Sequence, residues 1–422
     1  MLRGDAYENL RHLCKQIGPR LSGSDNAEKA VIATAAMLKK AGADTVYLQP
    51  CMVPHWVRGA KEAGNIQLSN GNKISLHLCA LGNSIGTHAA GVLAAVIEVK
   101  SMETLHLLGR SAVQGKIVFF NIPMNSLYLN TFQAYGESGI GRWDGPAQAA
   151  KYGAVGVLVR SLASNEDDYP HTGSTTYNDS FPPIPAVAIS TKDATLLSNL
   201  LQKDKALSVW FKTNCQMLAD KPSFNVIGEI RGTEYPDEII TVGGHLDSWD
   251  LGEGAHDDGA GCVQSIEVIN AFHQTGLRPK RTIRAVMFMN EENGGRGGDA
   301  YLAFAQSHHE KHVFALESDE GGFTPRFFSF DVSSSSFNRL AEWKPLLYPY
   351  GVYDFVQNGS GSDIEPLKAM GTSLAALHPD SQRYFDVHHA ASDRFESVSR
   401  RELLLGAANI AALIYLVSEH GL

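Results

Sequence analysis

The 422-residue sequence lacks several features that mark whole classes of protein. No apolar stretch reaches the roughly 18 residues that a membrane-spanning helix needs. The longest candidate, residues 407–417, is too short and is typical of a core helix. No long run of lysine and arginine occurs, and the formal net charge is −9. This balance argues against nucleic acid or an anionic membrane surface as the main partner.

Cysteine is scarce, and several common motifs are missing. The five cysteines are scattered without a Cys-x-x-Cys pair, which argues against a zinc ribbon or a disulfide scaffold. No Gly-x-Ser-x-Gly elbow or strand-following Gly-x-Gly-x-x-Gly loop occurs, which disfavours a serine hydrolase and a dinucleotide-binding enzyme. Residues 1–5 precede no apolar segment, so no signal peptide is expected. The chain is then either intracellular or a mature form.

The sequence contains patterns of an α/β protein with an insertion. The length favours two or three domains. Apolar spacing predicts helices in the first 40 residues, with Ser24 or Asp25 capping the second. Short β-rich runs then indicate a separate α/β insert. We expect a first segment of the main domain at 1–85, the insert at 86–203 and a second segment at 204–422.

The second segment alternates apolar strands with helical stretches. Continuous apolar runs predict central strands at residues 239–242, 283–289, 313–316 and 373–377. Helices between them favour a mixed, mostly parallel sheet sandwiched by helices.

Polar residues of metal-binding type follow these strands. They are His245 and Asp247, Asp257 and Asp258, Glu291 and Glu292, Glu317 and Asp319, with His388 and His389 in a late loop. Sites in such sheets form beyond the carboxyl ends of the strands, so these side chains are expected to converge. A divalent cation would offset the repulsion among the carboxylates. The donors suit zinc, with manganese or cobalt also compatible, and are numerous enough for two ions.

Except for Glu291 and Glu292, which directly follow an apolar strand and would need partners there, each of these pairs also has a purely structural interpretation. His245 and Asp247 alone would be a strand-end pair, and Asp257 with Asp258 would be a helix cap. Glu317 and Asp319 could be turn acids, and the two late histidines a surface pair. Only the complete set predicts a metal centre.

These motifs resemble those of the M28 metallopeptidases, the co-catalytic zinc aminopeptidases and carboxypeptidases. The similarity is greatest to the plasma glutamate carboxypeptidase branch. It covers most of the chain and is carried by residues 17–24, 53–59, 244–250, 276–282 and 317–319. The resemblance implies the zinc exopeptidase fold, with the insert as a protease-associated domain.

The resemblance also implies a role for individual residues. His245 and Glu292 would hold one zinc ion, Asp319 and His389 the other, and Asp257 would bridge the two.

His389 is preferred over His388 because the family has an acid four positions after the ligand, where this chain has Asp393. Glu291 would be the general base for a metal-bridged hydroxide, and Asp247 would orient His245. The implied substrates are dipeptides or short peptides.

The resemblance leaves several points open. The loop 359–363 resembles a family loop near the cleft, so Ser362 and Asp363 are expected to face substrate; otherwise the loop is a flexible turn. Glu320 departs from the family pattern and would add a carboxylate near the metals. Competing interpretations are a non-catalytic receptor-like member and a glutaminyl cyclase-like acyltransferase, which typically has one zinc. Relatives are often secreted or periplasmic and often homodimeric, while a cytoplasmic location stays open.

Overall fold

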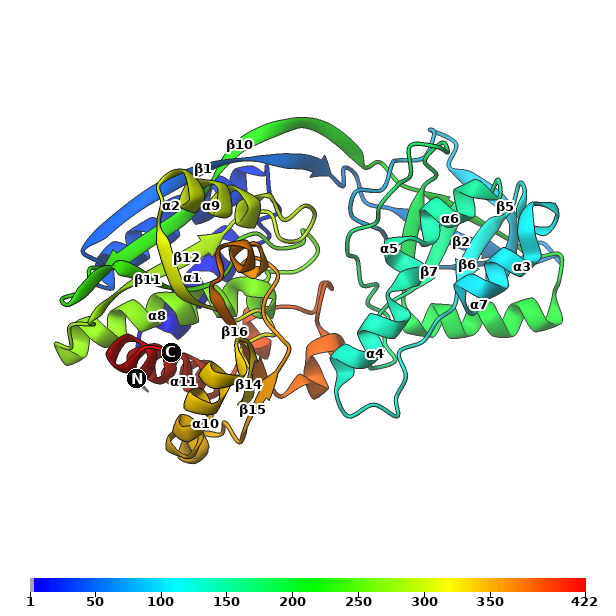
Figure 1. Ribbon diagram of the computed structural model, residues 1–422. Helices are drawn as coiled ribbons and strands as arrows, with labels where there is room; N and C mark the ends of the chain where they lie inside the picture. Colours follow the sequence, from blue (N-terminus) through cyan, green and yellow to red (C-terminus); the bar gives the residue numbers. More distant parts are fainter. Residues whose placement is uncertain (1–3) are drawn as a thin grey trace. The chain divides into compact units, whose positions relative to one another are not determined.

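The computed structural model describes residues 4–422 and divides into two compact units (Figure 1). Residues 1–3, part of the stretch considered above for a signal peptide, lie outside the described residues. The first unit comprises residues up to Pro54, Asp220–Tyr384 and Asp393–Leu422. The second comprises His55–Ala219 and Phe385–Ser392.

The first unit is built on a mixed eight-stranded sheet in the order β1-β10-β12-β11-β13-β16-β14-β15. Its strands are β1 (Thr45–Val57), β10 (Gln216–Ile230), β11 (Tyr235–His245), β12 (Arg281–Phe288), β13 (Lys311–Glu317), β14 (Pro325–Asp331), β15 (Asp354–Gln357) and β16 (Ser373–Pro379). The four strands predicted as central lie within β11, β12, β13 and β16. They are adjacent and parallel, which confirms that part of the expectation. Antiparallel pairing of β10 with β12 and of β14 with β16 makes the sheet mixed.

Helices accompany this sheet, and their ends follow the sequence signals. They are α1 (Ala6–His12), the π-helical turn η1 (Leu13–Ile17), α2 (Asp25–Lys40), α8 (Ala260–Thr275), α9 (Arg296–Ser307), α10 (Ser334–Leu347) and α11 (Arg400–His420). Short turns are η2 (Ala255–Gly259), η3 (Tyr348–Tyr350), η4 (Glu365–Met370), η5 (Ser381–Asp386) and η6 (Phe395–Ser397). The Ser24 side chain accepts a hydrogen bond from the Ala27 amide at 3.1 Å, so Ser24 is the predicted cap of α2.

Helix α11 is longer than the apolar run 407–417 indicated. Among the described residues, α11 is the one helix that is long and apolar enough to cross a membrane. Most of its apolar window is buried, however, and it packs against α8. Helix α11 is therefore a core helix of the first unit.

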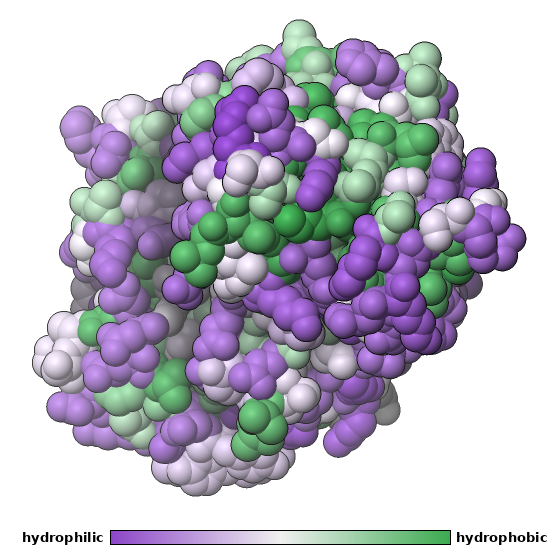
Figure 2. Space-filling model, turned by 90° about the vertical axis from the view of Figure 1, so that its right-hand side faces the viewer, coloured by the Kyte–Doolittle hydropathy of each residue, from purple (hydrophilic) through white to green (hydrophobic). Residues whose placement is uncertain are grey.

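The second unit has its own mixed sheet in the order β3-β2-β9-β5-β6-β7-β8-β4. Its strands are β2 (Ala63–Gln67), β3 (Lys73–Ser75), β4 (Leu78–Ala80), β5 (Val92–Val99), β6 (Ile117–Phe120), β7 (Gly156–Arg160), β8 (Ala186–Ile189) and β9 (Ser208–Lys212). Its helices are α3 (Met102–Val113), α4 (Thr131–Ser138), α5 (Ile140–Trp143), α6 (Gly145–Lys151) and α7 (Thr191–Lys203). Figure 2 shows a face on which apolar patches lie between polar side chains.

The observed division of the chain differs from the boundaries expected at 85/86 and 203/204. The second unit starts earlier because β2 pairs with β9, and β4 pairs with β8. It ends later because β9 belongs to the same sheet. Strands β2, β4 and β9 are short and lack the long apolar runs from which the insert was predicted.

Candidate metal centre

The carboxyl ends of β11, β12 and β13 lie at one edge of the first sheet. In the strand register His245 lies beside Phe288, and Gly243 lies beside Glu317. The polar residues that follow these strands therefore start from neighbouring positions, as expected for parallel strands.

His245 ends β11 and faces two carboxylates. Its Nε2 atom lies 3.1 Å from Asp257 Oδ1 and 3.1 Å from Asp319 Oδ1, and its side chain is 1% exposed. Its Nδ1 atom donates a hydrogen bond to the backbone carbonyl of Asp247 at 2.9 Å. Because Nδ1 is used in this way, Nε2 is the nitrogen presented to the acids.

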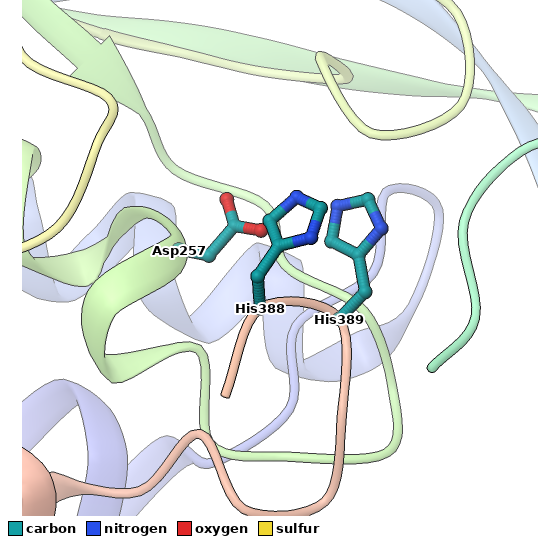
Figure 3. Close-up of side chains that lie close together, drawn as sticks. All are labelled: Asp257, His388 and His389. Carbon is teal, nitrogen blue, oxygen red and sulfur yellow. The ribbon is translucent and has the colours of Figure 1, made fainter. Parts of the chain in front are cut away.

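Asp257 and Asp258 are adjacent in η2 but are used differently. Asp258 accepts hydrogen bonds from the Gly261 amide at 2.9 Å and the His245 amide at 3.1 Å, so it stabilises the start of α8 and the end of β11. The carboxylate of Asp257 instead projects from the turn, as Figure 3 shows, and its Oδ1 faces His245. The structural and the ligand interpretations thus apply to different members of the pair.

Glu291 and Glu292 follow β12, on a turn held by Asp247. Asp247 Oδ1 accepts hydrogen bonds from the amides of Asn290 at 2.7 Å and Glu291 at 3.1 Å. The same oxygen is 3.8 Å from His245 Nδ1, so the backbone carbonyl of Asp247, more than its carboxylate, orients the imidazole. Glu292 is buried, and its Oε1 accepts from the Trp249 amide at 3.1 Å.

Two groups of donors in this unit have a spacing that fits a metal ion. One group is His245, Asp257 and Glu292, and the other is His245, Asp258 and Asp319; within each, the ligand atoms lie within 4.8 Å of one another. Both carboxylate oxygens of Asp258 already accept backbone hydrogen bonds. Asp257 and Asp319 are therefore better candidates for metal ligands than Asp258.

The electrostatics of this edge favour a bound cation. The pKa of Asp319 is raised to about 7, chiefly by burial; Glu291 and Asp257 contribute to the rise, while His245 opposes it. The pKa of Glu317 is raised to about 8, chiefly by burial and further by the nearby carboxylates of Asp319 and Glu291. Burial alone would lower the pKa of His245, but Asp319 and Asp257 raise it well above 6.5. Acids that resist ionisation in this way are stabilised as carboxylates by a dication.

Two further residues fix the loops of the site. Arg20 is fully buried and donates hydrogen bonds to the carbonyls of Leu246, Glu253 and Gly254 at 2.6 to 2.9 Å. Asp393 accepts from the amides of His256 at 2.9 Å and Asp257 at 3.2 Å. Arg20 entered the sequence-based prediction only as part of the segment 17–24, because an arginine in a Gly- and Ser-rich segment gives no sign of burial.

His388 and His389 belong to the segment 385–392 of the second unit, where their rings stack with centroids 3.5 Å apart (Figure 3). The Thr172 amide donates to the carbonyl of His389 at 2.9 Å, and His389 Nδ1 lies 3.3 Å from the Thr172 carbonyl. Arg142 Nη1 is 3.5 Å from the same nitrogen, and His171 Nδ1 is 2.6 Å from the His388 carbonyl. Residues of the second unit thus hold both histidines.

The loop residues expected to face substrate lie in different environments. Ser362 is exposed, and its hydroxyl donates to Glu291 Oε1 at 3.0 Å. Asp363 is 3% exposed, which disagrees with a substrate-facing role. Glu320 pairs with His378 Nδ1 at 2.8 Å, so its carboxylate has a partner of its own.

Comparisons with known proteins agree on one family. Residues 225–414 match the model of peptidase family M28. The chain is 36% identical over 414 residues to carboxypeptidase Q of Bos taurus and to that of Homo sapiens, covering 98% of this chain and 85% of each relative.

Solved structures give the same result. The crystal structure of a peptidase M28 precursor from Shewanella amazonensis SB2B has a TM-score of 0.93 and 32% identity, covering 98% of this chain and 92% of that one. A zinc aminopeptidase from Bacillus subtilis shares the fold, with a TM-score of 0.68 and 20% identity over 97% of this chain and 94% of that one. The chain belongs to peptidase family M28.

Proposed function

We propose that the chain is a di-zinc exopeptidase that hydrolyses dipeptides or short peptides. The observation that carries the proposal is His245 Nε2 facing Asp257 and Asp319 at 3.1 Å, with Glu292 in the same donor group. Zinc suits mixed imidazole and carboxylate donors, and the Bacillus subtilis neighbour of the same fold is a zinc aminopeptidase.

The ligands divide between two ions in this proposal. His245 and Glu292 would hold one, Asp319 and His389 would hold the other, and Asp257 would contribute to both. A hydrogen bond from His389 Nδ1 to the Thr172 carbonyl, 3.3 Å away, would leave Nε2 for the metal. The second unit is then the protease-associated domain of the family.

Bound zinc would acidify a water molecule and polarise the scissile carbonyl. Glu291 would take the proton from the attacking water and deliver it to the nitrogen of the leaving amine. Glu291 is suited to this task because the turn that carries it is fixed by Asp247, while Glu292 provides the neighbouring metal ligand. Asp247 holds the turn at Asn290 and Glu291 and presents its carbonyl to His245.

The test is a peptidase assay of the zinc-loaded protein on a dipeptide panel, with N-acetylated and C-amidated versions. These versions show which terminus the cleft requires. Glu291→Gln should retain two zinc ions while turnover falls about a thousandfold or more, as expected for loss of a general base in a preorganised site. The matched control is Glu234→Gln. Glu234 is exposed and precedes β11, the strand that His245 ends, so it lies away from the candidate metal centre.

Each alternative gives a different result in this assay. A protein that binds two zinc ions but cleaves nothing on the panel would contradict peptidase activity and favour a receptor-like role. Full activity with one zinc ion per chain would contradict the two-ion scheme. Near-native turnover of Glu291→Gln would remove Glu291 from the base role.

A further inference from the structure

The hydroxyl of Ser362 lies between two acids. It donates to Glu291 Oε1 at 3.0 Å, and it is 3.4 Å from Glu317 Oε1. A serine hydroxyl has a single proton, so it can donate fully to only one of these carboxylates. The shorter distance selects Glu291.

Glu317 fixes the backbone of the loop that carries Ser362. Glu317 ends β13 and is fully buried, and its Oε2 accepts hydrogen bonds from the amides of Asp363 at 3.0 Å and Ile364 at 3.1 Å. At Gly361 a Cβ atom would collide with the Glu317 side chain, so the loop lies directly against this acid. The position of Ser362 is therefore set by a buried residue of the central sheet.

Such a contact limits the freedom of the Glu291 side chain. The terminal torsion of a glutamate is broad, so a carboxylate held only through its backbone samples many orientations. A donor fixed on Oε1 selects one orientation and leaves Oε2 to accept a proton. The segment 358–362 also borders a cavity of about 550 Å³, so a substitution at Ser362 does not open a gap in the core.

We infer that Ser362, held in place by Glu317, is a positioning residue that orients the carboxylate of Glu291 for proton transfer. This inference rests on the proposed function, since it assigns Glu291 the role of base. It also replaces the expectation that Ser362 contacts substrate. A residue that orients the base changes turnover, whereas a residue that binds substrate changes KM.

The experiment compares Ser362→Ala and Ser362→Thr in the zinc-loaded protein on the best dipeptide substrate. Ser362→Ala should lower kcat about tenfold, as loss of a hydrogen bond to a charged group predicts, with KM and zinc content unchanged. Ser362→Thr keeps the hydroxyl and should stay within about threefold of the unsubstituted protein, because the cavity has room for the methyl group. The exposed Ser335→Ala in α10 is the matched control.

A second background separates positioning from a general structural effect. In Glu291→Gln, adding Ser362→Ala should lower the residual rate less than about twofold, because residues that act through one group are not additive. A full tenfold further loss would overturn the inference. A raised KM with unchanged kcat would also overturn it and would restore the substrate-contact interpretation.

A crystal structure of Ser362→Ala with zinc gives a readout that does not depend on activity. The Glu291 carboxylate should be displaced or spread over several conformers. A carboxylate in the same single position would overturn the inference, even if the protein is an active peptidase. If the unsubstituted protein has no peptidase activity, the proposed function is contradicted. The crystal structure of Ser362→Ala would still test whether Ser362 orients the Glu291 carboxylate.

Discussion

The ion pair of Arg284 with Glu310 is predicted to support stability without contributing to the metal centre. The Arg284 side chain is 4% exposed and donates to both oxygens of Glu310 at 2.8 Å. His312 Nε2 also lies 3.0 Å from Glu310, and Glu229 accepts from Arg284 Nε at 2.6 Å. Glu310 precedes β13, so this cluster lies at the opposite end of that strand from the metal centre.

The expected size of the effect follows from the titration of Glu310. Burial alone would raise its pKa, but hydrogen bonds from Arg284 and His312 outweigh burial and lower the pKa from 4.5 to about 2. That shift corresponds to roughly 3 kcal/mol, at about 1.4 kcal/mol for each pH unit. Because the folded-state pKa is the lower one, the stabilisation is complete above pH 4.5. It is lost as the pH falls towards 2.

Glu310→Gln should therefore lower the free energy of unfolding by about 3 kcal/mol at pH 7, measured by chemical denaturation. The difference from the unsubstituted protein should shrink as the pH is lowered from 4.5 to about 2. The exposed pair of Glu234 with Lys280 provides the control, and Glu234→Gln should change stability by less than about 0.5 kcal/mol. A Glu310→Gln variant within about 1 kcal/mol of the unsubstituted protein at pH 7, or a difference that persists unchanged at pH 2, would refute the reasoning.

Two further predictions concern the metal centre. His389→Ala should reduce the zinc content from two equivalents to one, whereas His388→Ala should keep both; elemental analysis decides, and the reverse result assigns the ligand to His388. Removal of zinc by a chelator should lower the melting temperature. Restoring free zinc to about a hundred times its Kd should return about 2.7 kcal/mol of stability. A melting temperature that does not respond to zinc would contradict a resident metal.

The strands and the donor set were predictable from sequence because both leave strong local signals. Continuous apolar runs identified β11, β12, β13 and β16, which are buried on both faces. Strands β14 and β15 were not predicted, since they lie towards the edge of the sheet. The early strands β2, β3 and β4 of the second unit were also missed, because each is only three to five residues long.

The use of each polar residue was less predictable than its presence. Arg20 acts through three carbonyls of a loop more than 200 residues away, and Ser362 acts through a glutamate 71 residues away. Such contacts depend on how loops return to the sheet edge, and no local spacing encodes them. Asp257 and Asp258 have the same side chain and are adjacent in sequence. The direction in which each side chain leaves the η2 turn makes Asp257 the proposed ligand and Asp258 the cap of α8.

The two glutamates that flank β13 show why one end of this strand is suited to catalysis and the other to stability. Glu310 before the strand meets Arg284, and its pKa is about 2. Glu317 at the end of the strand meets two further acids, Asp319 and Glu291, and its pKa is about 8. The protein supplies the countercharge for the first glutamate but supplies more negative charge around the second. A cluster of this kind is stable as carboxylates only with a cation from solution, and this need connects the charge pattern of the sheet to zinc-dependent hydrolysis.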